Sequence, residues 1–125
     1  MKELSNTEFE IMKVVWENEP PITSNIIMEH LGNEKQWKLA TILTLLNRLV
    51  KKGFLKTEKL SKERLYYPIV ERDKYLAIET SKFMKNYHNN SLKSFVDILF
   101  LNDNTNKKEI ESLMEFLERN TKRGD

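Results

Sequence analysis

The sequence predicts a mainly α-helical chain with one short β-hairpin near its middle, an α+β arrangement. Between Lys38 and Lys51 the apolar residues recur at the spacing of one helix face, and Gly53 follows where a helix commonly ends in the left-handed conformation. Two β-prone runs, 54–60 and 64–69, then surround a short polar turn, which predicts a hairpin. A helix, a glycine stop and a charged hairpin in this order indicate a winged helix-turn-helix.

Two shorter helices are expected before that segment. Ser5 and Glu8 form a capping-box pair, so the first helix should cover residues 6–17 and end before the two prolines at 20–21. Thr23 can cap the second helix. Its inward face and its expected glycine stop are Ile26, Ile27, Leu31 and Gly32.

The four apolar residues that define the third helix are Ile42, Leu45, Leu46 and Leu49. Its opposite side is polar, which is also true of any solvated surface helix. A winged helix-turn-helix binds DNA with such a helix and hairpin together. The charged hairpin that follows therefore makes a DNA-binding function a more specific prediction than the helix alone would.

Residues 72–125 show only helical periodicity, with helices expected over 72–89, over 91–101 and from Asn106 onward. Three amphipathic helices of this size cannot bury their own apolar stripes, so we divide the chain into a DNA-binding domain, 1–71, and a C-terminal three-helix dimerisation module, 72–125. The alternative is a monomer in which these helices pack back on the winged domain. The expected dimerisation residues are Leu76, Phe83, Tyr87, Leu92, Phe95, Val96, Leu99, Ile110, Leu113, Met114 and Leu117.

Composition limits the function. The chain has 125 residues and no cysteine, which removes disulfides and thiolate metal sites. It contains no apolar run long enough for a membrane span and no signal peptide, so we expect a cytoplasmic protein without a membrane partner. Residues 34–72 hold ten basic and four acidic side chains, a local charge of +6 within a total of +2. A polyanion should therefore bind the middle of the chain, although a charged solvated surface is the simpler alternative.

Several groups of residues then meet the pattern of a known family. They are Ser5, Glu8, Met12 and Trp16; Lys35, Trp37, Thr41, Ile42, Thr44, Leu45, Arg48 and Leu49; Lys51, Lys52, Gly53 and Phe54; Tyr66 and Tyr67; Thr80, Ser81 and Lys82; and Glu109, Ile110, Glu111 and Leu113. On these residues the chain resembles the penicillinase-repressor family (BlaI/MecI type), bacterial winged-helix repressors of β-lactam resistance genes. The resemblance implies a homodimer that binds a palindromic operator in double-stranded DNA and blocks transcription.

The helical wheel and the resemblance agree on the DNA contacts. Residues near the start of a recognition helix face base edges, and those farther along it or on the wing meet phosphates. Trp37 has a second interpretation, as a core residue, because tryptophans usually bury most of their surface. The expected base contacts are Trp37, Ala40, Thr41, Leu43 and Thr44. The expected phosphate contacts are Lys38, Asn47, Arg48, Lys51, Lys59, Lys62 and Arg64.

The chain departs from the family pattern at informative places. The family carries lysine and arginine where this chain has Ala40 and Leu43, and leucine can offer a base only an apolar contact, so we expect a different operator. A sensor protease cuts the family's repressors at an Asn-Phe bond, which aligns with Ile98 and Leu99 here; both also fit an ordinary core. The copper-sensing branch of the family uses a cysteine cluster, which this chain lacks.

A winged module that binds protein or RNA without specific operator binding is the alternative to a repressor. An enzyme is not expected, because His30 and His88 lie on separate predicted helices and are expected at the surface, with no acidic pair or phosphate loop beside them. No cofactor is expected, since the ligands of a zinc site cannot be assembled.

Overall fold

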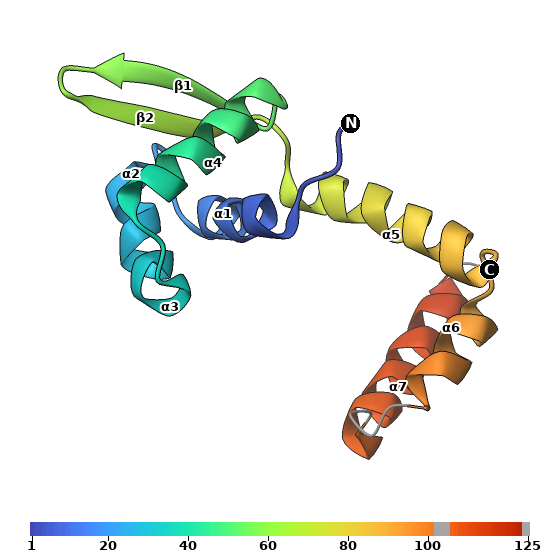
Figure 1. Ribbon diagram of the computed structural model, residues 1–125. Coiled ribbons are helices and arrows are strands. Elements are labelled where there is room, and N and C mark those ends of the chain that lie inside the picture. The colour runs from blue at the N-terminus through green and yellow to red at the C-terminus, as the bar shows by residue number, and fades with distance from the viewer. Residues whose placement is uncertain (102–105, 124–125) are drawn as a thin grey trace. The chain divides into compact units, whose positions relative to one another are not determined.

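The computed structural model describes residues 1–101 and 106–123, and only the backbone of residues 122 and 123. Its contacts divide the chain into two compact units, Met1–Glu79 and Thr80–Asp125 (Figure 1). The mainly α fold with one hairpin is confirmed. The elements are α1 (Asn6–Glu17), α2 (Ser24–Ile27), the π-helical turn η1 (Met28–Gly32), α3 (Asn33–Lys35), α4 (Leu39–Lys51), β1 (Leu55–Leu60), β2 (Glu63–Pro68), α5 (Arg72–His88), α6 (Leu92–Leu99) and α7 (Lys107–Arg123).

The first helix begins as predicted. The Ser5 hydroxyl accepts the backbone N–H of Glu8 at 3.2 Å, and the Glu8 carboxylate accepts the backbone N–H of Ser5 at 2.8 Å. These two bonds form the complete capping box and satisfy N–H groups that a helix start leaves unpaired.

The predicted end of the second helix is wrong. Gly32 keeps helical dihedrals (φ −55°), and the chain continues through η1 and α3 to Gln36, whose φ of 56° ends the helical run. A Cβ at Gly32 would lie 3.1 Å from the Met28 Cε atom, a close contact with the end of a flexible side chain.

The junction between α4 and the hairpin matches the sequence. Gly53 has φ 82°, as expected for the residue after a helix end. The turn of the hairpin contains two residues, Ser61 and Lys62, rather than the expected three, since Glu63 already pairs with Leu60.

An isolated β-bridge supports the base of the hairpin, which the sequence did not predict. Ile22 exchanges two backbone hydrogen bonds with Tyr66, at 2.9 and 2.8 Å. The segment before α2 is thereby joined to β2. The wing is anchored at this end, while β1 and β2 extend beyond it.

An aromatic cluster fixes the start of α5 in the first unit. The Tyr75 ring lies 5.5 to 6.1 Å from the rings of Phe9, Trp16 and Phe54. Its hydroxyl accepts the backbone N–H of Leu4 at 3.0 Å. Burial is the main reason that the pKa of Tyr75 is raised above its usual value. The first turn of α5 therefore belongs to the core of the winged unit.

A buried ion pair connects α1 to the end of α4. Glu8 is 2% exposed, and its carboxylate accepts a hydrogen bond from the Lys52 ammonium, which also donates to the Glu3 carbonyl at 3.1 Å. Burial alone would raise the pKa of Glu8, but the hydrogen bonds from Lys52 and Ser5 outweigh it and hold the pKa below its usual value. Glu8 is therefore charged at neutral pH.

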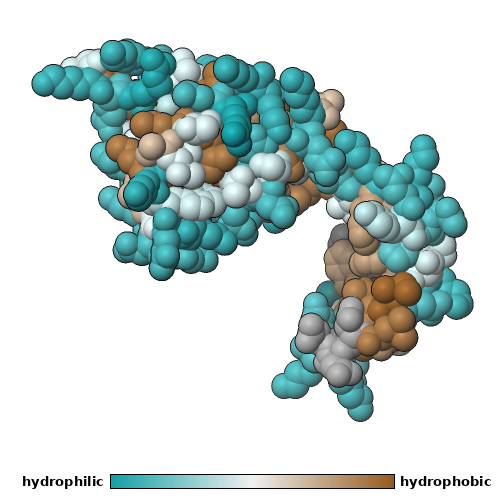
Figure 2. Space-filling view, in the orientation of Figure 1, coloured by the Kyte–Doolittle hydropathy of each residue, from teal (hydrophilic) through white to brown (hydrophobic). Residues whose placement is uncertain are grey.

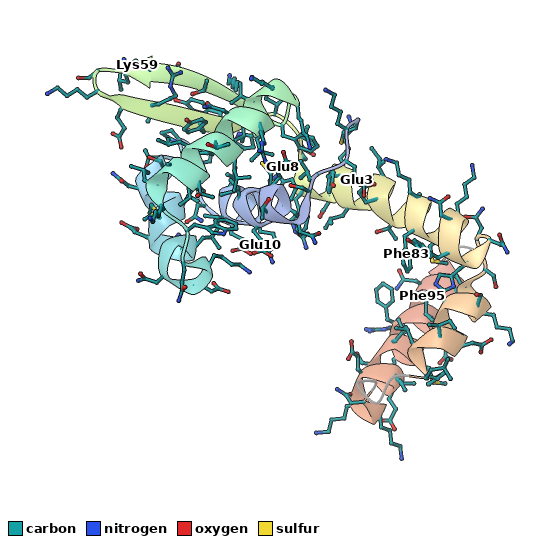
Figure 3. All side chains as sticks on the ribbon, in the orientation of Figure 1. Glu3, Glu8, Glu10, Lys59, Phe83 and Phe95 are labelled. Carbon is teal, nitrogen blue, oxygen red and sulfur yellow. The ribbon has the colours of Figure 1, made fainter. Side chains whose placement is uncertain are left out.

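The second unit has little interior of its own. Among its described residues, His88 is buried at 7% exposure, while the apolar side chains are half-buried or exposed. The imidazole Nδ1 lies 2.9 Å from the Ser94 hydroxyl, and the ring packs edge-on against Phe83 and Phe95 (Figure 3). The prediction of a surface position for His88 is wrong, because α6 folds back over the end of α5 and covers it. His30 is exposed, as predicted.

We predict that Glu8→Gln lowers the free energy of unfolding at pH 7 by roughly 1.5 to 3 kcal/mol, the usual value of a hydrogen bond to a charged group. The carboxyl has a lower pKa folded than unfolded, so its stabilisation is present above the unfolded pKa and is lost as the pH falls through the folded one. The difference from the wild type should therefore shrink in acid. Denaturant unfolding at several pH values measures it.

Glu10→Gln is the matched control. Glu10 lies on the other side of α1 from Glu8 (Figure 3) and pairs at 3.3 Å with Lys13 near the surface. Its loss should cost less than about 1 kcal/mol, as for other exposed pairs. Equal losses from both substitutions would contradict the role assigned to Glu8.

Candidate nucleic-acid interface

One face of α4 is buried and the other is open. The four predicted apolar residues line the core with 4% exposure or less. The expected DNA contacts of this helix are exposed along its opposite side: Ala40, Thr41, Leu43, Thr44, Asn47, Arg48 and Lys51.

Trp37, just before α4, has features of both of its predicted roles, as a core residue and as a base contact. The indole is half-buried and packs against the core, and part of it remains accessible beside the helix start. Lys38 is the N-cap residue, and its side chain is exposed beside the start of the helix.

The middle of α4 borders a shallow hollow shared with α1. Thr7 lines it together with Ala40, Thr41, Thr44, Leu45 and Arg48. The Thr44 hydroxyl donates to the Ala40 carbonyl at 3.0 Å, so its proton is used within the helix. Thr7 was not among the predicted site residues, because no local pattern shows which residue of α1 lies beside α4.

The hairpin carries a like-charge pair. Lys59 on β1 lies directly opposite Arg64 on β2, near the tip of the wing (Figure 3). Like charges at facing positions destabilise an antiparallel pair. Nearer the base, the Lys56 ammonium lies 5.4 Å from the centre of the Tyr67 ring, and Tyr67 donates to Glu58 at 3.0 Å.

The cations of the predicted interface are available for a partner. Among the residues that the structure describes, Lys13, Lys52, Arg72 and Lys93 take part in ion pairs, and none of the predicted phosphate contacts does. Lys52 differs from its neighbour Lys51, since it is held by Glu8 whereas Lys51 is exposed. The cations on the open side of α4 and on the wing are therefore free to meet an anionic partner.

The predicted dimerisation residues are distributed unevenly. Leu76 packs against the core of the first unit, beside Tyr75. The hydrophobic residues of the second unit gather in part over α6 (Figure 2). The predicted residues that are exposed there are Phe83, Tyr87, Leu92, Val96, Leu99, Leu113, Met114 and Leu117, whereas Phe95 and Ile110 are half-buried.

Three residues that shape the site were not assigned these roles by the sequence. Glu8 had been recognised only as a cap, and Lys52 only as part of a basic run, because their pairing joins positions 44 residues apart. The sequence assigned no role to Tyr75, because its neighbour Leu76 also fits the apolar face of the predicted helix.

No helix among the described residues has the length and apolar character needed to cross a membrane. An exposed helix face, cations that have no ion-pair partner among the described residues, and an anchored hairpin together define a winged helix-turn-helix regulator that binds DNA.

The sequence profile of the penicillinase repressor family matches residues 4–119, and the chain belongs to that family. It is 31% identical over 121 residues to the penicillinase repressor of Bacillus licheniformis, covering 97% of this chain and 94% of that protein. It is 35% identical over 123 residues to the methicillin resistance regulatory protein MecI of Staphylococcus aureus, covering 94% of each. The chain is therefore a transcriptional repressor rather than an enzyme.

Two solved structures resemble the winged unit. The solution structure of the DNA-binding domain of the repressor BlaI aligns with a TM-score of 0.52 at 35% identity, over 60% of this chain and 94% of that one. The monomeric form of Bacillus licheniformis BlaI in complex with the blaP half-operator aligns with a TM-score of 0.51 at 34% identity, over 59% and 89%. These similarities confirm the predicted fold of the first unit.

We predict that Lys59→Thr stabilises the hairpin while weakening DNA binding. The substitution removes the repulsion from Arg64 and places a β-branched residue in a strand, which should raise the free energy of unfolding by about 0.2 to 1 kcal/mol. It also removes one cation from the wing. Denaturant unfolding and duplex titration by fluorescence anisotropy measure the two effects.

Lys56→Thr removes the same charge from the same strand, but its ammonium contacts the Tyr67 ring instead of opposing a cation. This variant should show no gain in stability. A gain of the same size in both variants would mean that strand propensity, not charge repulsion, limits the hairpin.

Proposed function

We propose that two copies of this chain bind a palindromic DNA operator and block transcription, with α4 of each copy in a major groove and the wing against the phosphate backbone. The observation that carries the proposal is the set of cations on α4 and the hairpin that have no ion-pair partner within the described residues. A duplex supplies the missing anions, and the release of its counterions favours binding.

The proposal assigns base contacts and phosphate contacts to different residues of the interface. Ala40, Thr41, Leu43 and Thr44, with the accessible edge of Trp37, would face the bases. Asn47, Arg48 and Lys51, with Lys38 and the wing cations, would hold the backbone and fix the register of the helix.

Dimerisation is proposed for the region 72–125. Its support is the exposure of most apolar side chains in the second unit, which leaves a single copy without an apolar interior there. A second copy with the same surface would cover them, and two-fold symmetry would match a palindromic operator. Leu76 is the exception, because it already packs on the first unit.

The regulated genes are proposed from the relatives. The similar proteins are named as a penicillinase repressor and as a methicillin resistance regulatory protein, so β-lactam resistance genes are the candidate targets. Inactivation by a sensor protease stays a prediction from the resemblance. Ile98 and Leu99 end α6 and are about half exposed, and the last turn of that helix would have to open before a protease could bind the bond.

The test of operator binding is a titration of the full chain against the duplex upstream of its own gene and against a scrambled duplex of equal length. Binding to several phosphates requires a steep fall of the logarithm of the affinity with the logarithm of the salt concentration. A chain that binds neither duplex in dilute buffer would contradict the proposal and favour the protein-binding or RNA-binding alternative.

We predict that Thr44→Ala changes the preference between duplexes, whereas Lys51→Ala weakens all duplexes alike and lowers the salt slope by about 1. The reason is that base contacts distinguish sequences and phosphate contacts do not. Lys93→Ala is the control, because it also removes one charge, from an exposed pair in α6. It should leave both quantities unchanged, and equal sequence-independent losses for Thr44→Ala and Lys51→Ala would contradict the assignment.

A further inference from the structure

The exposed side of α4 presents methyl groups where a base-reading helix often presents hydrogen-bond donors. Leu43 is 38% exposed and follows Ala40 by three residues, and Thr44 follows Ala40 by four, so the three form an exposed strip on the open side. A single exposed leucine needs no explanation on an ordinary surface. Here, however, it lies on the side of the helix that also carries Arg48 and Lys51.

Thr44 adds to the apolar character of this surface. Its hydroxyl proton is donated to the Ala40 carbonyl, so the group has no proton left for a base edge while that bond is kept. What Thr44 can offer a partner is a methyl group and an oxygen that accepts. The nearest side chains with a donor are Thr41, which is exposed beside Ala40, and Asn47, one turn after Leu43.

The positive charge near the strip favours an anionic partner. Cations flank it on α4 and on the hairpin, which favours a polyanion over an apolar protein surface. In the major groove of DNA the C5 methyl of thymine is the apolar group on a base edge, and cytosine and the purines present donors and acceptors there. A surface of methyl groups between cations therefore fits thymine.

We infer that α4 recognises its DNA site by apolar contact with thymine C5 methyl groups, made mainly by Leu43 with Ala40 and Thr44 beside it. The inference rests on the proposed function and names the chemical group that this interface reads. It makes Leu43 the residue that determines specificity at the base pair it contacts.

The experiment starts by selecting bound duplexes from a randomised DNA pool with the full chain. The selected duplex is then resynthesised with deoxyuridine in place of single thymines, which removes the C5 methyl and keeps base pairing. Uracil at the contacted positions should weaken binding about fourfold per methyl group, as expected for one buried methyl. Uracil in the flanking sequence should have no effect.

Variants separate this role from a general loss of binding. Leu43→Ala should bind the thymine and uracil duplexes nearly equally at the contacted position. Thr44→Val keeps the methyl group and loses the hydroxyl, so it should retain the preference for thymine. Lys51→Ala should weaken both duplexes and keep their ratio.

Each outcome has a distinct meaning. Selection of a duplex that the wild type binds equally with thymine or uracil overturns the inference and leaves operator binding intact. A thymine preference that survives in Leu43→Ala overturns the role of Leu43. Failure to select any duplex overturns the proposed function and the inference with it.

Discussion

The position of α4 depends on a carboxylate buried beneath the end of the helix. Glu8 starts α1 through its bond to Ser5 and at the same time receives the ammonium of Lys52, the C-cap residue of α4. A charge in that position is tolerated because the Oε1 atom of Glu8 accepts hydrogen bonds from both Ser5 and Lys52, and removing one partner of the ion pair would leave the other without compensation. The N-terminal turn of α1 and the C-terminal turn of α4 are therefore held together. This contact helps to fix which face of α4 is buried and which stays open.

The charged residues of the interface lower the stability of the elements that carry them. Lys59 and Arg64 face each other across the hairpin, and the cations on α4 lack ion-pair partners among the described residues. Such repulsion is tolerated where a polyanionic partner later neutralises it. The anchoring bridge from Ile22 to Tyr66 compensates at the base of the wing by adding two backbone hydrogen bonds. The hairpin is therefore firmly held at one end and strained by its own charges at the other.

Local signals predicted most of the fold. The capping box at Ser5, the stop at Gly53 and the stripe on α4 each depend on residues within one or two helical turns, and all three were confirmed. Contacts between distant segments could not be predicted. The burial of His88 depends on α6 folding back over α5. Gly32 is the residue type that commonly ends a helix, yet the helical run continues through it to Gln36.

The π-helical turn η1 is a place where the chain could lose one residue. A π turn holds one more residue than an α turn over the same span, so it acts as an insertion absorbed within a helix. Ile27 and Leu31 are both buried on either side of the exposed Glu29 and His30. Deleting one of the exposed pair would bring the buried two to a spacing of three, which still places them on one face of a regular helix. The fold would therefore accept the loss of one residue here with both side chains still in the core.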